Sequence, residues 1–572
     1  MVMYHVSLRS LIRTCHTPLI TRNHILSLVR LNSTLRSAST MTPRTYDSAL
    51  AHLSLLQSNR AIVSLFAPPP PSPSPPKPSS ANPRAQDLNA LAIPEVLAWL
   101  ERAGISQERL AELKFIHVAG TKGKGSVCAY LISILTRAGD GEGVDPGRVG
   151  TYTSPHLVSV RERIQLDGRP ISQELFAKYF FEVWDAFTAS ARAERSRRGG
   201  GEVSVSVSDA ELEGPATKPF YFRFLTIMAF HVFLAEGVRS AVVECGIGGE
   251  YDSTNVLPPG AVTASVVSQL GIDHVGMLGP TLPEIAWHKA GVCKEGRKCF
   301  TRRLGGTSAE QETMRVLRRR AEEKGARLVE LEDRDVEAWG GVRGDGCLEG
   351  EFQKYNQALA AAAAREHLRI LGGGPEAQQP GSLAGLPAFV LDGLRRAKLR
   401  GRCETREDGD VTWLIDGAHT AESLDEVGRW FALKRRGLPG TARTVLLFNQ
   451  QERDAPALLR RLLGSIRGNL ETQAPGDAIF DEAVFTRNEL RGRGDESEPE
   501  RDLAVQRAGT DAMREISPAT TALVVDNVAE AVAQARGAAS RRGGDGRVAV
   551  LVTGSLHLVG ALLRTLEPEA QL

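Results

Sequence analysis

Three features are absent from this sequence of 572 residues. Its seven cysteines show no CxxC spacing, no uninterrupted apolar run is long enough to span a bilayer, and the formal net charge is only +2. Dispersed, odd-numbered cysteines argue against a disulfide framework or a zinc site and suit reduced thiols. Without an apolar span or an excess of charge, we expect neither stable membrane insertion nor a nucleic-acid partner.

The first forty residues lack Asp, Glu and Lys altogether but contain five arginines among many Ser and Thr. This composition is typical of a mitochondrial import sequence, with a disordered basic tail as the alternative, and we assign residues 1–43 to it. Met41 stands near the end of this segment, so a second start there would yield a cytosolic form. We therefore expect a mitochondrial location, in the matrix or peripherally at the inner membrane, together with a cytoplasmic one.

What the chain does contain is an alternation of β-branched and helical runs. Hydrophobic residues make up 42% and charged residues 24% of it, a balance typical of globular proteins. Alternating strands and helices predict α/β domains whose parallel sheets are covered on both faces. The predicted strands are 115–118, 148–152, 241–245, 262–268, 411–415, 444–448, 482–485, 522–525 and 548–552, and the longer helices are 125–137, 220–236, 352–371, 421–433 and 556–566.

The chain exceeds the roughly 250–300 residues that one core usually holds, so we expect two domains. The Gly- and Arg-rich segment 395–402 is the predicted boundary. It separates a larger N-terminal P-loop domain, 44–395, from a smaller Rossmann-like domain, 396–572. Three low-complexity segments are predicted to be solvated insertions: 67–84, 189–218 and 491–507.

The strongest local signal is a glycine-rich segment, Gly120-Thr-Lys-Gly-Lys-Gly-Ser126, between a predicted strand and a predicted helix. Glycines let backbone N–H groups close around phosphate oxygens, and the helix N-terminus adds a favourable dipole. Lys124 is placed to reach the outer phosphates. The spacing departs from an ordinary Walker loop, because Val118 stands where that loop has its first glycine and Gly125 separates Lys from Ser. A glycine-rich surface turn is the alternative.

Other polar residues also follow predicted strands, where open α/β sheets bind their ligands. Glu244 ends an apolar strand, and a buried carboxylate in such a place suits a hard cation. Each of the others has a plainer alternative. Ser154 could belong to a capped turn, the Asp273-His274 pair to a structural hydrogen bond, and Asp416 to a helix cap.

Six segments, taken in order, resemble the folylpolyglutamate synthase family, a group of ATP-dependent ligases related in fold to the muramyl-peptide ligases. They are Gly120–Ser126, Thr151–Arg163, Ala241–Asn255, Leu270–Val292, Val411–Ser423 and Leu551–Gly560. The modified phosphate loop is the family's own form. Lys122, Trp287 and the segment Leu446–Asp454 are similar to the eukaryotic branch. The resemblance covers the chain from about Tyr46 to Leu566, apart from the insertions.

The resemblance implies a Mur-ligase-like first domain and a nucleotide site between the two domains. Ser154, Glu244 and His274 would hold magnesium at two sites, and a monovalent cation such as K⁺ is compatible with them. The implied nucleotide-binding residues are Gly120, Thr121, Lys122, Gly123, Lys124, Gly125, Ser126, Asn356, Arg402 and Asp416.

Four residues carry the implied chemistry and glutamate binding. Lys124, Lys289 and His419 are the implied catalytic residues, and His419 and Ser555 would bind the incoming glutamate. The family's counterpart of Lys289 can be carbamylated, which would turn a cation into a carboxylate-like anion. An ordinary phosphate-neutralising lysine is the alternative at this position.

The implied activity is the addition of L-glutamate to the γ-carboxylate of tetrahydrofolyl-polyglutamates, which retains folates in the cell. ATP would phosphorylate that carboxylate to an acyl phosphate, and the glutamate amine would then displace phosphate. We expect reduced folates, L-glutamate and ATP as partners, and a monomeric protein. One alternative is dihydrofolate synthase, which performs the same chemistry on dihydropteroate. A P-loop ATPase or kinase is the more distant alternative, because it leaves Asp416, His419 and Ser555 unexplained.

Overall fold

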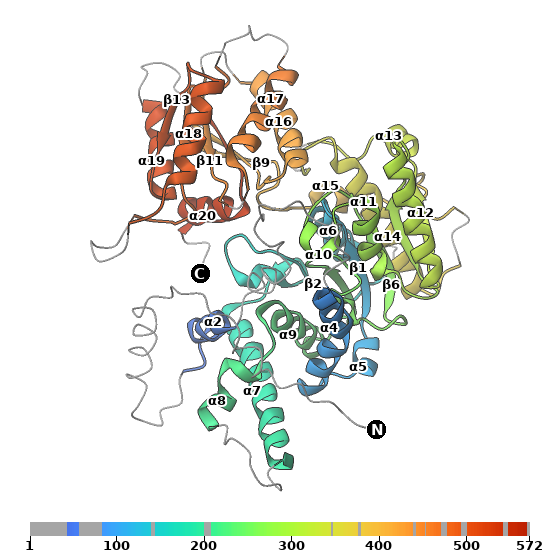
Figure 1. Cartoon of the computed structure of the whole chain (residues 1–572). Coiled ribbons are helices and arrows are strands. Elements are labelled where there is room, and N and C mark those ends of the chain that lie inside the picture. Colours follow the sequence, from blue (N-terminus) through green and yellow to red (C-terminus); the bar gives the residue numbers. More distant parts are fainter. Residues whose placement is uncertain are drawn as a thin grey trace.

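The chain forms two α/β units, each built on its own sheet (Figure 1). The computed structural model describes residues 43–56, 83–138, 144–198, 208–344, 347–375, 379–438, 442–451, 453–470, 478–492, 500–540 and 547–568. The predicted import segment up to residue 42 and the proline-rich insertion up to residue 82 lie outside the described residues.

The first sheet has eight strands in the order β4-β3-β2-β5-β1-β6-β7-β8. They are β1 (Lys114–Ala119), β2 (Val149–Tyr152), β3 (Ile164–Leu166), β4 (Arg169–Pro170), β5 (Ser240–Glu244), β6 (Val262–Val267), β7 (Lys298–Arg302) and β8 (Arg327–Leu331). Neighbours pair in parallel except for β2–β3 and β3–β4. Because β2, β5, β1 and β6 are adjacent, the segments after their carboxyl ends meet at one edge of the sheet.

Helices cover both faces of this sheet. They are α2 (Tyr46–Leu55), α4 (Pro83–Arg102), α5 (Gln107–Ala111), α6 (Lys124–Ala138), α7 (Gln173–Arg198), α8 (Asp209–Glu213), α9 (Tyr221–Ala235), α10 (Val275–Leu278), α11 (Leu282–Lys289), α12 (Ser308–Glu323), α13 (Asp333–Trp339), α14 (Gln353–Leu371) and α15 (Ala388–Arg396). Successive strand residues point to opposite faces. Phe115 accordingly packs in a core with α4, α7 and α9, whereas Ile116 packs in a core with α6, α14 and α15.

The second sheet has six strands in the order β13-β12-β11-β14-β10-β9. Its elements are β9 (Glu404–Asp408), β10 (Val411–Ile415), α16 (Ala421–Arg436), β11 (Arg443–Phe448), α17 (Ala455–Asn469), β12 (Glu482–Phe485), α18 (Ala504–Ile516), β13 (Thr521–Val524), α19 (Val528–Ser540), β14 (Val548–Thr553) and α20 (Leu556–Leu566). Only β9 is antiparallel to its neighbour. Leu414 packs toward α16 and α17, and Trp413 toward α19 and α20.

The predicted α/β class is confirmed, and every strand predicted above is present within one residue at either end. Strands β7 and β8 escaped prediction because the charged residues Lys298, Arg302 and Arg327 at their ends conceal the apolar pattern. Among the helices that the structure describes, none combines the length and apolar character needed to cross a membrane.

Much of the predicted insertion 189–218 is exposed but helical. Helix α7 continues to its end at Arg198, and α8 follows within the same segment. Ala, Arg and Glu are strong helix formers, so a biased composition there favours helix over coil. Leu212 is buried, and two ion pairs join the helices, Arg192–Glu213 and Arg195–Asp209. Helix α18 likewise begins inside the predicted insertion 491–507.

Candidate active site

The phosphate loop connects β1 to α6 and depends on two glycines in unusual conformations. Gly120 has φ +150° and Gly123 has φ +81°. A Cβ at Gly120 would lie 1.9 Å from Ser268 Oγ, and one at Gly123 would lie 2.4 Å from Asn356 Oδ1. The amides of the first turn of α6 have no partner within the helix, so they are available to an anion. The loop therefore has the form of a phosphate cradle.

Part of the loop is held by the segment after β6. The backbone N–H groups of Thr121 and Lys122 both donate to Gln269 O, at 2.9 and 3.0 Å. Ser268 Oγ donates to Lys122 O at 2.6 Å, and Thr121 Oγ1 donates to Gly271 O at 3.0 Å. These amides are already used, so Thr121 and Lys122 shape the loop, and any phosphate contact from Lys122 must come from its side chain.

Two lysines from distant parts of the chain meet at this loop. Lys124 Nζ donates to Gly120 O at 3.1 Å, and Lys289 Nζ donates to the same oxygen at 2.8 Å. Lys289 ends α11 and is 2% exposed. Burial, with the charge of Lys124 in addition, lowers the pKa of Lys289 to about 7. In a large fraction of molecules the Lys289 side chain is therefore an uncharged amine at neutral pH. Carbamylation requires this form, because only the uncharged amine reacts with carbon dioxide.

Glu244 lies at the carboxyl end of β5, beside the segment that follows β2. Ser154 N–H donates to Glu244 Oε2 at 3.1 Å, and Glu244 is 4% exposed. Burial raises the pKa of Glu244, and the nearby charge of Lys124 opposes that rise. Within the described residues no cation lies at ion-pair distance from this carboxylate. A buried, unpaired carboxylate next to a serine is a donor set that fits magnesium.

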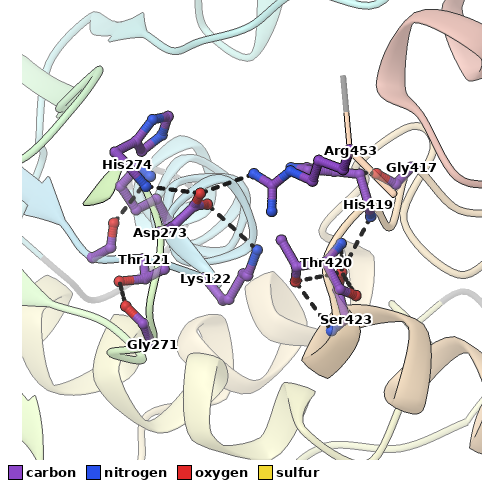
Figure 2. A network of polar contacts seen from close by, with 12 residues as sticks. Thr121, Lys122, Gly271, Asp273, His274, Gly417, His419, Thr420, Ser423 and Arg453 are labelled. Atoms are coloured by element: carbon purple, nitrogen blue, oxygen red, sulfur yellow. Dashed lines mark hydrogen bonds and ion pairs between the residues drawn. The ribbon is translucent and has the colours of Figure 1, made fainter. Parts of the chain in front are cut away.

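His274, the third predicted magnesium ligand, lies after β6 at the start of α10. Within the described ranges no group of three or more His, Cys, Asp or Glu side chains is arranged to hold a metal. His274 begins α10 in the left-handed conformation, with φ 50°. The imidazole of His274 points away from the Asp273 carboxylate, whereas the backbone N–H of His274 donates to Asp273 Oδ1 at 2.9 Å (Figure 2). The structure therefore brings Ser154 and Glu244 into direct contact and puts His274 beside Asp273.

Asp273 links the phosphate loop to the second domain (Figure 2). Its Oδ2 lies 3.7 Å from Lys122 Nζ, and its Oδ1 lies 3.0 Å from Nη2 of Arg453. Arg453 precedes α17 in the second domain. Burial would raise the pKa of Asp273, but the charges of His274, Lys122 and Arg453 outweigh it and hold the pKa below its ordinary value. Asp273 is therefore ionised and bridges two cations from different domains.

Asn356 lies on the opposite side of the loop, on α14. It is buried, and its Nδ2 donates to Gln353 Oε1 at 3.0 Å. Gln353 Nε2 in turn donates to Ser126 Oγ at 3.4 Å, in the first turn of α6. Asn356 and Ser126 thus belong to one polar layer beneath the phosphate loop, and Asn356 touches the loop through Gly123.

In the second domain Asp416 follows β10 and organises the interdomain connection. Its two oxygens accept from Cys403 N–H and Ala418 N–H, both at 2.8 Å. Burial raises the pKa of Asp416, and Arg402 opposes that rise. A Cβ at Gly417 would lie 2.8 Å from Arg402 Nη1, so this guanidinium rests directly on the loop after β10. Asp416 is therefore not a helix cap, since Thr420 is the N-cap of α16; it fixes the loop after β10 beside Arg402.

His419 lies in the same loop, before the N-cap Thr420 of α16. Its Nδ1 is 2.8 Å from Gly417 O, an acceptor, which assigns the ring proton to Nδ1 and leaves Nε2 as the basic nitrogen. Burial lowers the pKa of His419 to about 4, although the hydrogen bond to Gly417 opposes this. At neutral pH His419 is an uncharged imidazole.

Ser555 follows β14 and begins α20. Its Oγ accepts from His557 N–H at 3.1 Å, so the hydroxyl caps this helix. Helix α20 packs against the loop after β2 so closely that a Cβ at Gly560 would lie 2.2 Å from Leu157 O. This contact presses the second domain onto the segment that carries Ser154.

A cavity of about 660 Å³ opens between the two domains next to these residues. Gly125, Ser154, Glu244 and Arg402 line one end of it. Arg453 was not among the predicted site residues, although its segment was singled out. The position of this segment directly after β11, at the same sheet edge as Asp416 and Ser555, is the signal that could have identified it.

This fold and site define a two-domain α/β ligase that binds a nucleotide at a modified phosphate loop. No family model matches the chain. It is 38% identical over 539 residues to a folylpolyglutamate synthase from the fungus Neurospora crassa, covering 92% of each chain. The chain therefore belongs to the folylpolyglutamate synthase family, as the sequence motifs predicted.

Solved structures of the same family share the fold. A Mycobacterium tuberculosis folylpolyglutamate synthase complexed with ADP and AMPPCP matches with a TM-score of 0.58 and 22% identity, covering 84% of this chain and 97% of that one. A folylpolyglutamate synthase complex with AMPPCP and folate matches with a TM-score of 0.56 and 20% identity, over 91% and 99% of the two chains.

Proposed function

We propose that this protein is an ATP-dependent ligase that adds L-glutamate to folates. Membership of the folylpolyglutamate synthase family supports this activity. The observation that carries it is the bridge from Lys122 through Asp273 to Arg453. This bridge brings the polar strand ends of the second domain up to the phosphate loop, where an activated acceptor would meet the incoming amino acid.

A carboxylate is a poor electrophile, so the acceptor must first be activated. ATP transfers its γ-phosphoryl group to the γ-carboxylate of the folate tail, giving an acyl phosphate and ADP. Lys124 and the amides at the start of α6 stabilise the charge on the phosphoryl group as it transfers. Arg402, next to the cavity end that holds Gly125, adds a second cation.

The amine of glutamate then attacks the acyl carbon, and phosphate leaves. That amine must lose a proton, and Nε2 of His419, the ring nitrogen that carries no proton, would accept it. Ser555 and the N-terminus of α20 offer hydrogen-bond donors to the carboxylate of the incoming glutamate.

Magnesium is the metal that these residues would hold. Glu244 and Ser154 form the donor pair, and a bound cation would neutralise phosphate charge there. His274 would contribute to a second magnesium site, as the family resemblance implies, with its imidazole free of the Asp273 network in Figure 2. Carbamylation of Lys289 would add an anionic ligand near Gly120.

The experiment is glutamate incorporation by the purified protein with ATP and magnesium, offering tetrahydrofolate and dihydropteroate separately. We expect incorporation into tetrahydrofolate, with ADP and phosphate released in equal amounts. Incorporation into dihydropteroate alone would make the protein a dihydrofolate synthase. ATP hydrolysis without incorporation into either acceptor would contradict the ligase assignment and favour a P-loop ATPase.

We also infer a mitochondrial and a cytoplasmic form that arise from starts at Met1 and Met41. The composition of the first forty residues supports this proposal. A C-terminal fluorescent fusion should label both compartments, and replacing Met41 with Ala should leave only the mitochondrial signal. We expect a monomer, which sedimentation at micromolar concentration would test.

A further inference from the structure

The cavity between the domains extends well beyond the catalytic end. Its longest wall is one face of α6, formed by Gly125, Ala129, Ile132, Thr136 and neighbouring residues. These positions recur at helical spacing, and α6 rises about 1.5 Å per residue, so the twelve steps from Gly125 to Arg137 span roughly 18 Å. The cavity therefore runs outward from the phosphate loop along the whole of α6.

The other walls come from the β3–β4 hairpin and from the connection between the domains. These two walls contribute most of the cations. The basic residues that line the cavity are Arg137, Arg169, Arg396, Lys398, Arg400 and Arg402, and the acidic ones are Glu162, Asp167 and Glu244. The lining is therefore basic, although the protein as a whole is nearly neutral.

The acidic lining residues outside the catalytic end are already engaged. Glu162 accepts from the N–H groups of three successive residues after His156, at 2.7 to 2.9 Å. Asp167 accepts from Val149 N–H and pairs with Arg148. Neither carboxylate lies at ion-pair distance from a basic residue of the lining.

Within the described part of the chain, three of the basic lining residues have no carboxylate partner. Arg137 and Arg396 share Asp392, and Arg400 pairs with Glu404 and Glu567. In contrast, the described residues place no carboxylate at ion-pair distance from the remaining three, which are Arg169, Lys398 and Arg402. Cations that line a cavity without partners favour an anionic ligand.

We infer that this basic cavity binds the γ-glutamyl tail of the folate acceptor. The inference rests on the proposed function and identifies where the tail lies. A γ-glutamyl unit adds five main-chain bonds, about 6 Å when extended, and one free carboxylate. About three units fit along α6 when the terminal γ-carboxylate lies by the phosphate loop. Successive α-carboxylates then reach Arg402, Lys398 and Arg169 on the surrounding walls.

The test compares acceptors of different tail length. Full-length Arg169→Gln, Lys398→Gln and the double variant are assayed with tetrahydrofolate carrying one, three or five glutamates. An exposed contact of this kind changes affinity about two- to fivefold. We expect KM of the double variant to rise about five- to twentyfold for the tri- and pentaglutamates. For the monoglutamate we expect kcat unchanged and KM within about twofold of the wild-type value.

Arg507→Gln is the matched control. Arg507 is an exposed cation on α18 outside the cavity, and its replacement by Gln removes one positive charge, as each single substitution in the cavity does. Penta-γ-L-glutamate without a pteridine should inhibit the wild type and the control but not the double variant. An equal rise of KM at every tail length, or equal inhibition of all proteins by this peptide, would overturn the inference. Wild-type protein without glutamate incorporation would instead contradict the proposed function.

Discussion

Asp273 in the first domain accepts a hydrogen bond from Arg453 of the second domain at 3.0 Å, while its other oxygen faces Lys122 of the phosphate loop. The nucleotide loop and the second domain thus share one carboxylate. Any group that competes for Lys122, such as a phosphate, also changes how firmly Asp273 holds Arg453. We therefore expect nucleotide binding and domain position to be coupled through Asp273.

Replacing Asp273 with Asn should loosen the contact between the domains. Arg453 is partly exposed, and an ion pair of this kind contributes about 0.2–1 kcal/mol, so we expect the closed population to fall by up to about fivefold. Distance distributions between spin labels on α13 and α17, without nucleotide, would measure this. Asp425→Asn is the control, because Asp425 pairs with Arg461 inside the second domain. Identical distributions for both variants would contradict the coupling.

Replacing Gly123 with Ala should weaken nucleotide binding at least tenfold. The new Cβ would meet Asn356 Oδ1 at 2.4 Å, and φ +81° disfavours any side chain. Gly104→Ala is the matched control, since Gly104 has φ +74° but nothing within 4 Å of its Cβ. Calorimetric titration with AMPPCP would compare the two. If both variants bind equally well, the steric argument fails.

Replacing Lys124 with Ala should abolish ligation while the fold persists. The ammonium group is next to Gly120 O, where it would neutralise phosphoryl charge, and losing such a contact costs about 100-fold or more in kcat. Circular dichroism would check the fold. Lys178→Ala, on the exposed side of α7, should retain full activity. Undiminished turnover by the Lys124 variant would remove Lys124 from the mechanism.

Replacing Glu244 with Gln should stabilise the metal-free protein and destroy its response to magnesium. Burial raises the pKa of Glu244, so its charge is unfavourable in the folded state at neutral pH when nothing binds it. The variant should therefore melt at a higher temperature than the wild type in EDTA. Magnesium with AMPPCP should raise the melting temperature of the wild type alone. An equal rise in both proteins would show that the metal binds elsewhere.

Lys289 should make stability depend on pH in a defined direction. Its pKa is about 7 when folded, against 10.5 for an ordinary lysine, so the unfolded chain binds more protons between these values. Relative to Lys289→Met, the wild type should gain up to about 1.4 kcal/mol of stability per pH unit from pH 7 toward 10. Below pH 7 the difference should level off. Urea unfolding in carbon-dioxide-free buffers would measure it, and a flat difference throughout would contradict a depressed pKa.

The sequence by itself determined the fold class and the family. The patterns that identified them are local in the sequence: the glycines Gly120 and Gly123, the carboxylate Glu244 at the end of a strand, and the order of the motifs. Local patterns can be recognised without knowing the fold. Parallel strands also imply that polar strand ends share an edge. This is why Ser154 and Glu244, 90 residues apart, were expected to meet and do so at 3.1 Å.

Only the tertiary structure decided which charges face one another. The partners of Asp273 come from loops in two domains, and the basic cavity combines α6, a hairpin and the domain connection. The spacing of residues along the chain does not predict these contacts, because they depend on how the two domains pack against each other. The orientation of His274 and the lowered pKa of Lys289 could not be predicted from the sequence either, because side-chain orientation and burial depend on the tertiary structure.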